Sequence, residues 1–145
     1  MSNDTPTPSA FPIDHLGVAV QSVDVALRFW RDQLGLPLSL RETVESEKVH
    51  VAMLRTGDSR IELLEPTSAE STVAKFIEKR GEGLHHIAIR VPDLPAAVAR
   101  LREAGARVLN DPREGAGGHL YVFVHPASTG GVLLELIEEP RAAHR

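Results

Sequence analysis

Two stretches of the chain alternate between apolar and other residues in the way that is typical of β-strands. Residues 13–20 read Ile-Asp-His-Leu-Gly-Val-Ala-Val, and residues 84–91 read Leu-His-His-Ile-Ala-Ile-Arg-Val. At an offset of 71 residues, His15 lies over His86 and apolar positions lie over apolar positions. A match at a fixed offset indicates an internal repeat. A residue that recurs at equivalent positions of a repeat is a stronger functional candidate than the same residue alone.

Each of these stretches is followed by a segment with apolar residues at helical spacing. These two segments are residues 23–34 and 94–104. Ser22 and Asp93 stand at the N-cap positions, and Gly35 and Gly105 stand where a left-handed C-cap residue is favoured. The pattern therefore predicts two helices that begin and end at matching places.

The two halves also end alike. Apolar runs at residues 49–54 and 120–124 lead to turns, and residues 61–65 then match residues 134–138 at an offset of 73. This match lays Glu62 over Glu135. Each half is predicted to contain a strand, a helix and three further strands.

The repeat gives a domain organisation. We expect a first module over residues 13–66, a linking segment over 67–83 with a helix at 71–79, and a second module over 84–139. Residues 1–12 and 140–145 are expected to be loose ends, the first a flexible N-terminal tail. The fold class is α+β, with two βαβββ modules related by a pseudo-twofold axis.

The repeat also selects candidate metal ligands. A single histidine or glutamate on a strand is usually structural, but equivalent positions meet around a pseudo-twofold axis. Four residues could converge there, namely His15, Glu62, His86 and Glu135. Two imidazoles and two carboxylates suit a divalent ion such as Zn, Co, Ni or Mn. The alternative is four polar residues on an outer sheet face that recur through common ancestry alone.

Other histidines fit this scheme less well. His85 neighbours His86 but should point to the opposite face of its strand, which makes two adjacent ligands awkward. His125 precedes Pro126 in a turn, where we expect a capping role.

Composition narrows the function classes. The 145 residues correspond to one domain, and 16 Lys and Arg against 20 Asp and Glu give a net charge of −4, which disfavours nucleic acid as a partner. The absence of cysteine leaves histidine and carboxylate as metal ligands. No apolar run is long enough to span a membrane, so we expect a soluble cytoplasmic protein.

Nearly the whole chain, from about residue 13 to 139, resembles the vicinal oxygen chelate superfamily, also called the glyoxalase fold. Within it, residues 13–20, 60–66, 79–88 and 131–136 are similar to the methylmalonyl-CoA epimerase family. The resemblance implies a cupped mixed sheet around a divalent metal held by His15, Glu62, His86 and Glu135.

The activity that this resemblance implies is interconversion of the 2R and 2S epimers of methylmalonyl-CoA, a small CoA thioester, by α-proton abstraction through a metal-stabilised enolate. Epimerisation requires two acid–base groups. Glu135 is the first candidate by resemblance. Several family members carry Glu where this chain has Val51, so the second is expected to be Glu62, with Glu45, Glu47, His50 or a water molecule as alternatives.

The resemblance also implies a homodimer. Local cations would have to contact the CoA phosphates, and the candidates are Lys75, Lys79, Arg80 and Arg113.

Three other functions remain open. A glyoxalase I-type lyase acting on a glutathione hemithioacetal would use the same ligand order, but residues 65–83 and the turn at Pro126 favour the epimerase. In an extradiol-type dioxygenase, Glu62 would be an unwanted fourth ligand. A metal-free small-molecule-binding protein of the same fold is disfavoured because all four ligands are present and only six residues are aromatic.

Overall fold

The computed structural model describes residues 11–138, which form one eight-stranded mixed sheet with three α-helices. The strands are β1 (Ile13–Ala19), β2 (Leu38–Val44), β3 (Val49–Thr56), β4 (Ser59–Pro66), β5 (Gly83–Arg90), β6 (Arg113–Glu114), β7 (Leu120–Val124) and β8 (Leu134–Glu138). The α-helices are α1 (Val23–Leu27), α2 (Thr72–Arg80) and α3 (Leu94–Glu103). Within residues 11–138, no helix is long and apolar enough to cross a membrane.

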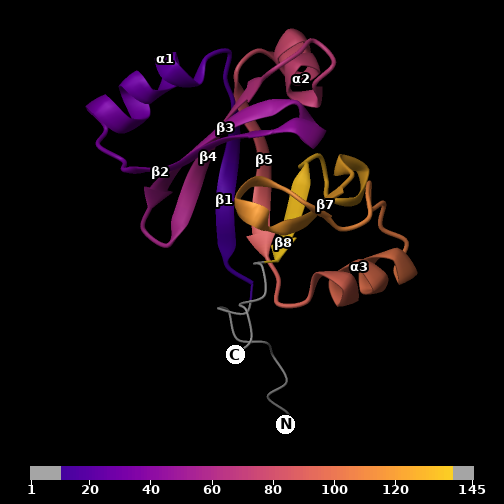
Figure 1. The fold of residues 1–145 in the computed structure, drawn as a ribbon. Coiled ribbons are helices and arrows are strands. Elements are labelled where there is room, and N and C mark those ends of the chain that lie inside the picture. The colour runs from indigo at the N-terminus through magenta and orange to yellow at the C-terminus, as the bar shows by residue number, and fades with distance from the viewer. Residues whose placement is uncertain (1–10, 139–145) are drawn as a thin grey trace.

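The sheet is arranged symmetrically around two central strands. Its strand order is β2-β3-β4-β1-β5-β8-β7-β6, so each strand of the first half has a counterpart in the second. The central strands β1 and β5 pair antiparallel, whereas β1 pairs with β4 and β5 with β8 in parallel. Figure 1 shows β1 and β5 side by side in the middle of the curled sheet. The predicted α+β fold with two matching halves is confirmed.

The expected loose ends, residues 1–12 and 140–145, lie outside the described part of the chain apart from residues 11 and 12. The described helices differ slightly from the predicted ones. The first helix changes after Leu27 into a wider turn over Arg28–Gln33, in which the Leu34 amide donates to the Phe29 carbonyl. The predicted caps at Ser22 and Asp93 are confirmed, because each side chain accepts a hydrogen bond from a backbone N–H of its helix.

Strand alternation separates a helix-covered face from a second face. Leu63 of β4 packs in the cluster under α1, and Leu136 of β8 packs in the cluster under α3. The residues beside them in sequence, Glu62 and Glu135, point to the other face of the sheet. They are nevertheless buried, with only 6% and 8% of their surface exposed. The curled second face therefore encloses polar side chains.

Two irregularities interrupt the pairing of β1 with β5. Between the pairs Ile13–Ile89 and His15–Ala88, β1 advances two residues while β5 advances one, so Asp14 is the extra residue of a β-bulge. Near Gly17 the opposite happens, and His85 is the extra residue on β5. A bulge can bring consecutive side chains to the same side of a strand. The prediction that His85 points away from His86 is wrong, because the alternation is broken there and both side chains line the same cavity.

The bulged pairing also brings a histidine ring against a glycine backbone. A Cβ atom built on Gly17 would lie only 2.2 Å from Cε1 of His86. The His86 ring is buried and has edge-to-face contacts with the rings of His15, His85 and Phe123. Gly17 therefore provides the space that this ring occupies.

We predict that Gly17→Ala destabilises the metal-free protein by about 1–3 kcal/mol, because the packed His86 ring must move. Urea unfolding followed by circular dichroism measures this free energy. In a His86→Ala background the same substitution should be neutral or stabilising, because the clash is absent and alanine loses less entropy than glycine. An equal loss in both backgrounds would show that the His86 ring is not the cause.

Candidate metal centre

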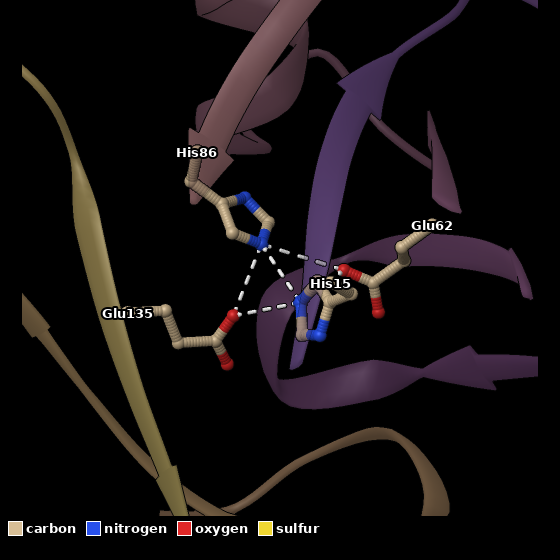
Figure 2. Close-up of side chains that lie close together, drawn as sticks. All are labelled: His15, Glu62, His86 and Glu135. Atoms are coloured by element: carbon tan, nitrogen blue, oxygen red, sulfur yellow. Dashed lines mark hydrogen bonds and ion pairs between the residues drawn. The ribbon is translucent and has the colours of Figure 1, made fainter. Parts of the chain in front are cut away.

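The four ligands predicted from the repeat converge at one point. Figure 2 shows their side chains directed toward one another from β1, β4, β5 and β8. The Nε2 atoms of His15 and His86 are 3.1 Å apart, and Oε1 of Glu135 lies 3.1 and 3.0 Å from them. Oε1 of Glu62 lies 3.2 Å from the first nitrogen and 3.5 Å from the second. All four donor atoms lie within 4.8 Å of one another.

This geometry fits a single divalent ion. Nitrogen and oxygen ligands at about 2.0–2.2 Å from a common ion are separated by about 3.0–3.5 Å when they are neighbours in its coordination shell. The five donor separations above lie in that range. The donor set also suits the ion, because two neutral imidazoles and two carboxylates neutralise a charge of +2.

The electrostatics show how strongly this pocket favours positive charge. Burial alone would lower the pKa of His15, but the charge of Glu62 and the hydrogen bond to Asp14 raise it to about 12. Burial would also lower the pKa of His86, yet its hydrogen bonds to Glu135 and Glu62 raise it. Both shifts favour the protonated, positively charged form of these histidines, and a metal at this position would have to displace such protons.

The carboxylates respond in the opposite direction. Burial would raise the pKa of Glu62, but the charge of His15 outweighs it, and this pKa lies well below its usual range. Hydrogen bonds from His15 and His86 likewise overcome burial and lower the pKa of Glu135. Both glutamates are therefore carboxylates, as metal ligation requires.

Asp14 lies directly behind His15. Its Oδ2 accepts a hydrogen bond of 2.7 Å from Nδ1 of His15, and Arg60 and Arg90 donate to its two carboxylate oxygens. Burial would raise the pKa of Asp14, but the hydrogen bond to His15 and the charge of Arg60 hold it well below its usual range. Sequence reasoning missed Asp14, although its place before the first repeated histidine was a signal.

His85 stands behind His86 in a comparable way. The Nδ1 atoms of the two rings are 2.9 Å apart, and the two rings meet edge to face. Burial and the nearby charge of His86 lower the pKa of His85 to about 4, so its imidazole is neutral.

A cavity of about 320 Å³ opens beside the cluster, which is large enough for a small ligand group. Glu62, His86 and Glu135 lie in its wall, and much of the rest of the lining is apolar, including Val51 and Leu64. The site therefore combines a charged centre with apolar surroundings.

Glu47 brings a further carboxylate to this cavity. It lies in the short turn after β2, and its Oε2 accepts a hydrogen bond from the Tyr121 hydroxyl. Nη1 of Arg113 is 3.5 Å from the same oxygen. Burial and the hydrogen bond to Glu47 raise the pKa of Tyr121, so the phenol keeps its proton. Sequence reasoning named Glu47 only as an alternative, and nothing in the pattern pointed to Tyr121.

The remaining candidates lie elsewhere or have other roles. His50 faces Arg41 and Thr43 on the exposed side of β2 and β3. His125 accepts from the Ala127 amide, so its predicted capping role is confirmed. Arg113 lines the cavity, whereas three other cations in the described chain do not, namely Lys75, Lys79 and Arg80.

Comparisons with known proteins identify the family of the chain. Residues 14–123 match the model of the glyoxalase, bleomycin resistance protein and dioxygenase superfamily. The ethylmalonyl-CoA/methylmalonyl-CoA epimerase of Cereibacter sphaeroides is 37% identical over 127 residues, which cover 86% of this chain and 95% of the relative.

Two solved structures are similar as well. Methylmalonyl-CoA epimerase from Mycobacterium tuberculosis is 37% identical, with a TM-score of 0.86 over 89% of this chain and 88% of the other. A variant of the Streptomyces coelicolor methylmalonyl-CoA epimerase in complex with 2-nitronate-propionyl-CoA is 40% identical, with a TM-score of 0.84 over 89% and 97%. The chain therefore belongs to the glyoxalase, bleomycin resistance protein and dioxygenase superfamily and, within it, to the family of the methylmalonyl-CoA epimerases.

Proposed function

We propose that this protein is a metal-dependent epimerase that interconverts the 2R and 2S forms of methylmalonyl-CoA. The observation that carries the proposal is the cluster of two histidines and two glutamates, three of which lie in the wall of a cavity, in a chain whose relatives carry that activity in their names. The Streptomyces coelicolor relative in complex with 2-nitronate-propionyl-CoA supports a CoA thioester as the ligand class.

His15, Glu62, His86 and Glu135 would hold the metal. A divalent ion at this position would supply Lewis acidity to the carbonyl and carboxylate oxygens of the substrate, which lowers the cost of charge on the deprotonated α-carbon. The candidates remain Co, Zn, Mn and Ni, because a nitrogen and oxygen shell suits each of them.

The chain itself must move two protons, one at each face of the α-carbon. We assign the proton transfer at one face to Glu135, which is ionised and is also a proposed ligand of the ion. We assign the other to Glu47, which reaches the same cavity from the first half of the chain. Tyr121 and Arg113 hold the Glu47 carboxylate in place.

This assignment differs from the expectation that Glu62 is the second base. Oε1 of Glu62 lies close to both histidine nitrogens, and its side chain is 8% exposed. Oε1 of Glu135 lies equally close to these nitrogens, so the cluster is assigned one base only, and Glu47 is preferred as the other because it lines the cavity from outside the cluster. Glu62 is therefore kept as a metal ligand. The expected homodimer and cytoplasmic location stay predictions.

The metal-loaded protein should exchange the α-hydrogen of methylmalonyl-CoA. In heavy water, starting from one epimer, we expect loss of the α-proton signal and appearance of the other epimer by proton NMR. The glutathione hemithioacetal of methylglyoxal, assayed in parallel, should not be converted. Absence of both deuterium uptake and epimerisation would contradict the proposal, and turnover of the hemithioacetal alone would identify a lyase.

Removing one proposed ligand should empty the metal site. We predict that His86→Ala loses most of its bound ion after dialysis, measured by elemental analysis, since only three of the four ligands remain. His50→Ala is the matched control, because that histidine lies on the exposed side of β2 and β3 and should leave the metal content unchanged. Full occupancy in His86→Ala would show that the ion binds elsewhere.

The roles of Glu47 and Glu62 can be distinguished by replacing each with glutamine, which has the same shape but no charge. We predict that Glu47→Gln retains the metal but lowers the epimerisation rate by about 10²–10⁴-fold, the usual contribution of an acid–base group. It should still exchange the α-hydrogen of the one epimer that faces Glu135. Glu62→Gln should lose less activity, since an amide oxygen can remain a ligand. The reverse ranking would restore Glu62 as the second base.

A further inference from the structure

The two bulges between β1 and β5 occupy equivalent places in the two halves. The extra residues are Asp14 and His85, which are separated by the same offset of 71 as the two histidines that follow them. Bulges next to functional sites commonly redirect a side chain. In each half, the bulged residue contacts the ring that follows it, at Nδ1.

Asp14 is the more firmly held of the two. It is 0% exposed, and its Oδ2 accepts hydrogen bonds from Nδ1 of His15 at 2.7 Å and from Nη2 of Arg60 at 2.6 Å. Its Oδ1 accepts from Nε and Nη2 of Arg90 at 3.1 and 2.9 Å. The two guanidinium groups come from the neighbouring strands β4 and β5, so three central strands fix one carboxylate.

His85 offers a neutral partner in place of a carboxylate. If Nε2 of His86 is a ligand, its Nδ1 carries the proton and donates to Nδ1 of His85, 2.9 Å away. His85 then carries its own proton on Nε2. The ring is also held from the other side by an edge-to-face contact with Phe76.

We infer that Asp14 and His85 are the positioning residues of the two metal-binding histidines, and that Asp14 contributes more to metal affinity than His85. This inference rests on the metal site proposed above. A hydrogen-bond acceptor at Nδ1 keeps the proton on that nitrogen and leaves the Nε2 lone pair of each histidine directed at the ion. An anionic acceptor also makes the imidazole a more basic ligand, so its Nε2 binds the metal more strongly. Arg60 and Arg90 hold Asp14 in the required position.

The direct test is the affinity for cobalt(II). Calorimetric titration of the metal-free full-length chain with cobalt chloride should give an affinity about 10–100-fold weaker for Asp14→Asn than for the unaltered protein. His85→Leu should weaken binding by a smaller factor. Glu138→Gln is the matched control, because Glu138 is another buried carboxylate but accepts from the Leu94 amide at the start of α3. Its cobalt affinity should not change.

The outcomes separate this inference from the proposed function. Equal affinity of Asp14→Asn and the unaltered protein would overturn the role of Asp14 while leaving the metal site intact. A larger loss in His85→Leu than in Asp14→Asn would overturn the ranking. Failure of the unaltered protein to bind cobalt would contradict both the inference and the proposed metal site.

A measurement on the unaltered protein tests the inference even if the Asp14→Asn variant does not fold. In the zinc-loaded chain, long-range proton–nitrogen NMR should find the proton of His15 on Nδ1, in slow exchange with water, and the metal on Nε2. Metal on Nδ1, or rapid exchange of that proton, would overturn the inference.

Discussion

The pairing of β1 with β5 is the contact on which the rest of the structure depends. It is the junction at which the two halves of the sheet meet, and the pseudo-twofold axis passes between these two antiparallel strands, perpendicular to them. Residues in equivalent positions are brought together there and nowhere else in the sheet. His15 and His86 lie on these two strands, and the parallel neighbours β4 and β8 add one glutamate each. One strand pairing therefore builds a cluster of four candidate ligands from two copies of a pattern of one histidine and one glutamate.

The site has a cost for folding. Two carboxylates and two histidines are almost fully withdrawn from water, and like charges face one another at short distance. The carboxylates raise the pKa of both histidines, which favours protons that compensate part of this charge. A divalent ion would replace those protons and link binding to the stability of the central strands. The two bulges and the close approach at Gly17 serve the same site. They interrupt the regular pairing of β1 with β5, and they direct side chains toward the cluster.

The strands, the helices and the repeat could be predicted from the sequence because each produces a regular pattern of apolar and polar residues. Alternation and helical spacing located most strands and all three helices, and the repeat selected the four ligands. The bulges left no such trace, so the positions of Asp14 and His85 relative to the rings could not be predicted. Glu47 was equally hidden, since it lies in a turn whose contact with Tyr121 depends on tertiary structure. The two-residue strand β6 is too short to give any pattern.

The central claim is that ligands from both halves bind one ion. A crystal structure of the cobalt-loaded protein, with anomalous scattering recorded at the cobalt absorption edge, tests it most directly. We expect one strong peak per chain, about 2.0–2.2 Å from Nε2 of both histidines and from a carboxylate oxygen of Glu62 and of Glu135. A peak whose ligands come from only one half of the chain, or from residues outside this cluster, would contradict it.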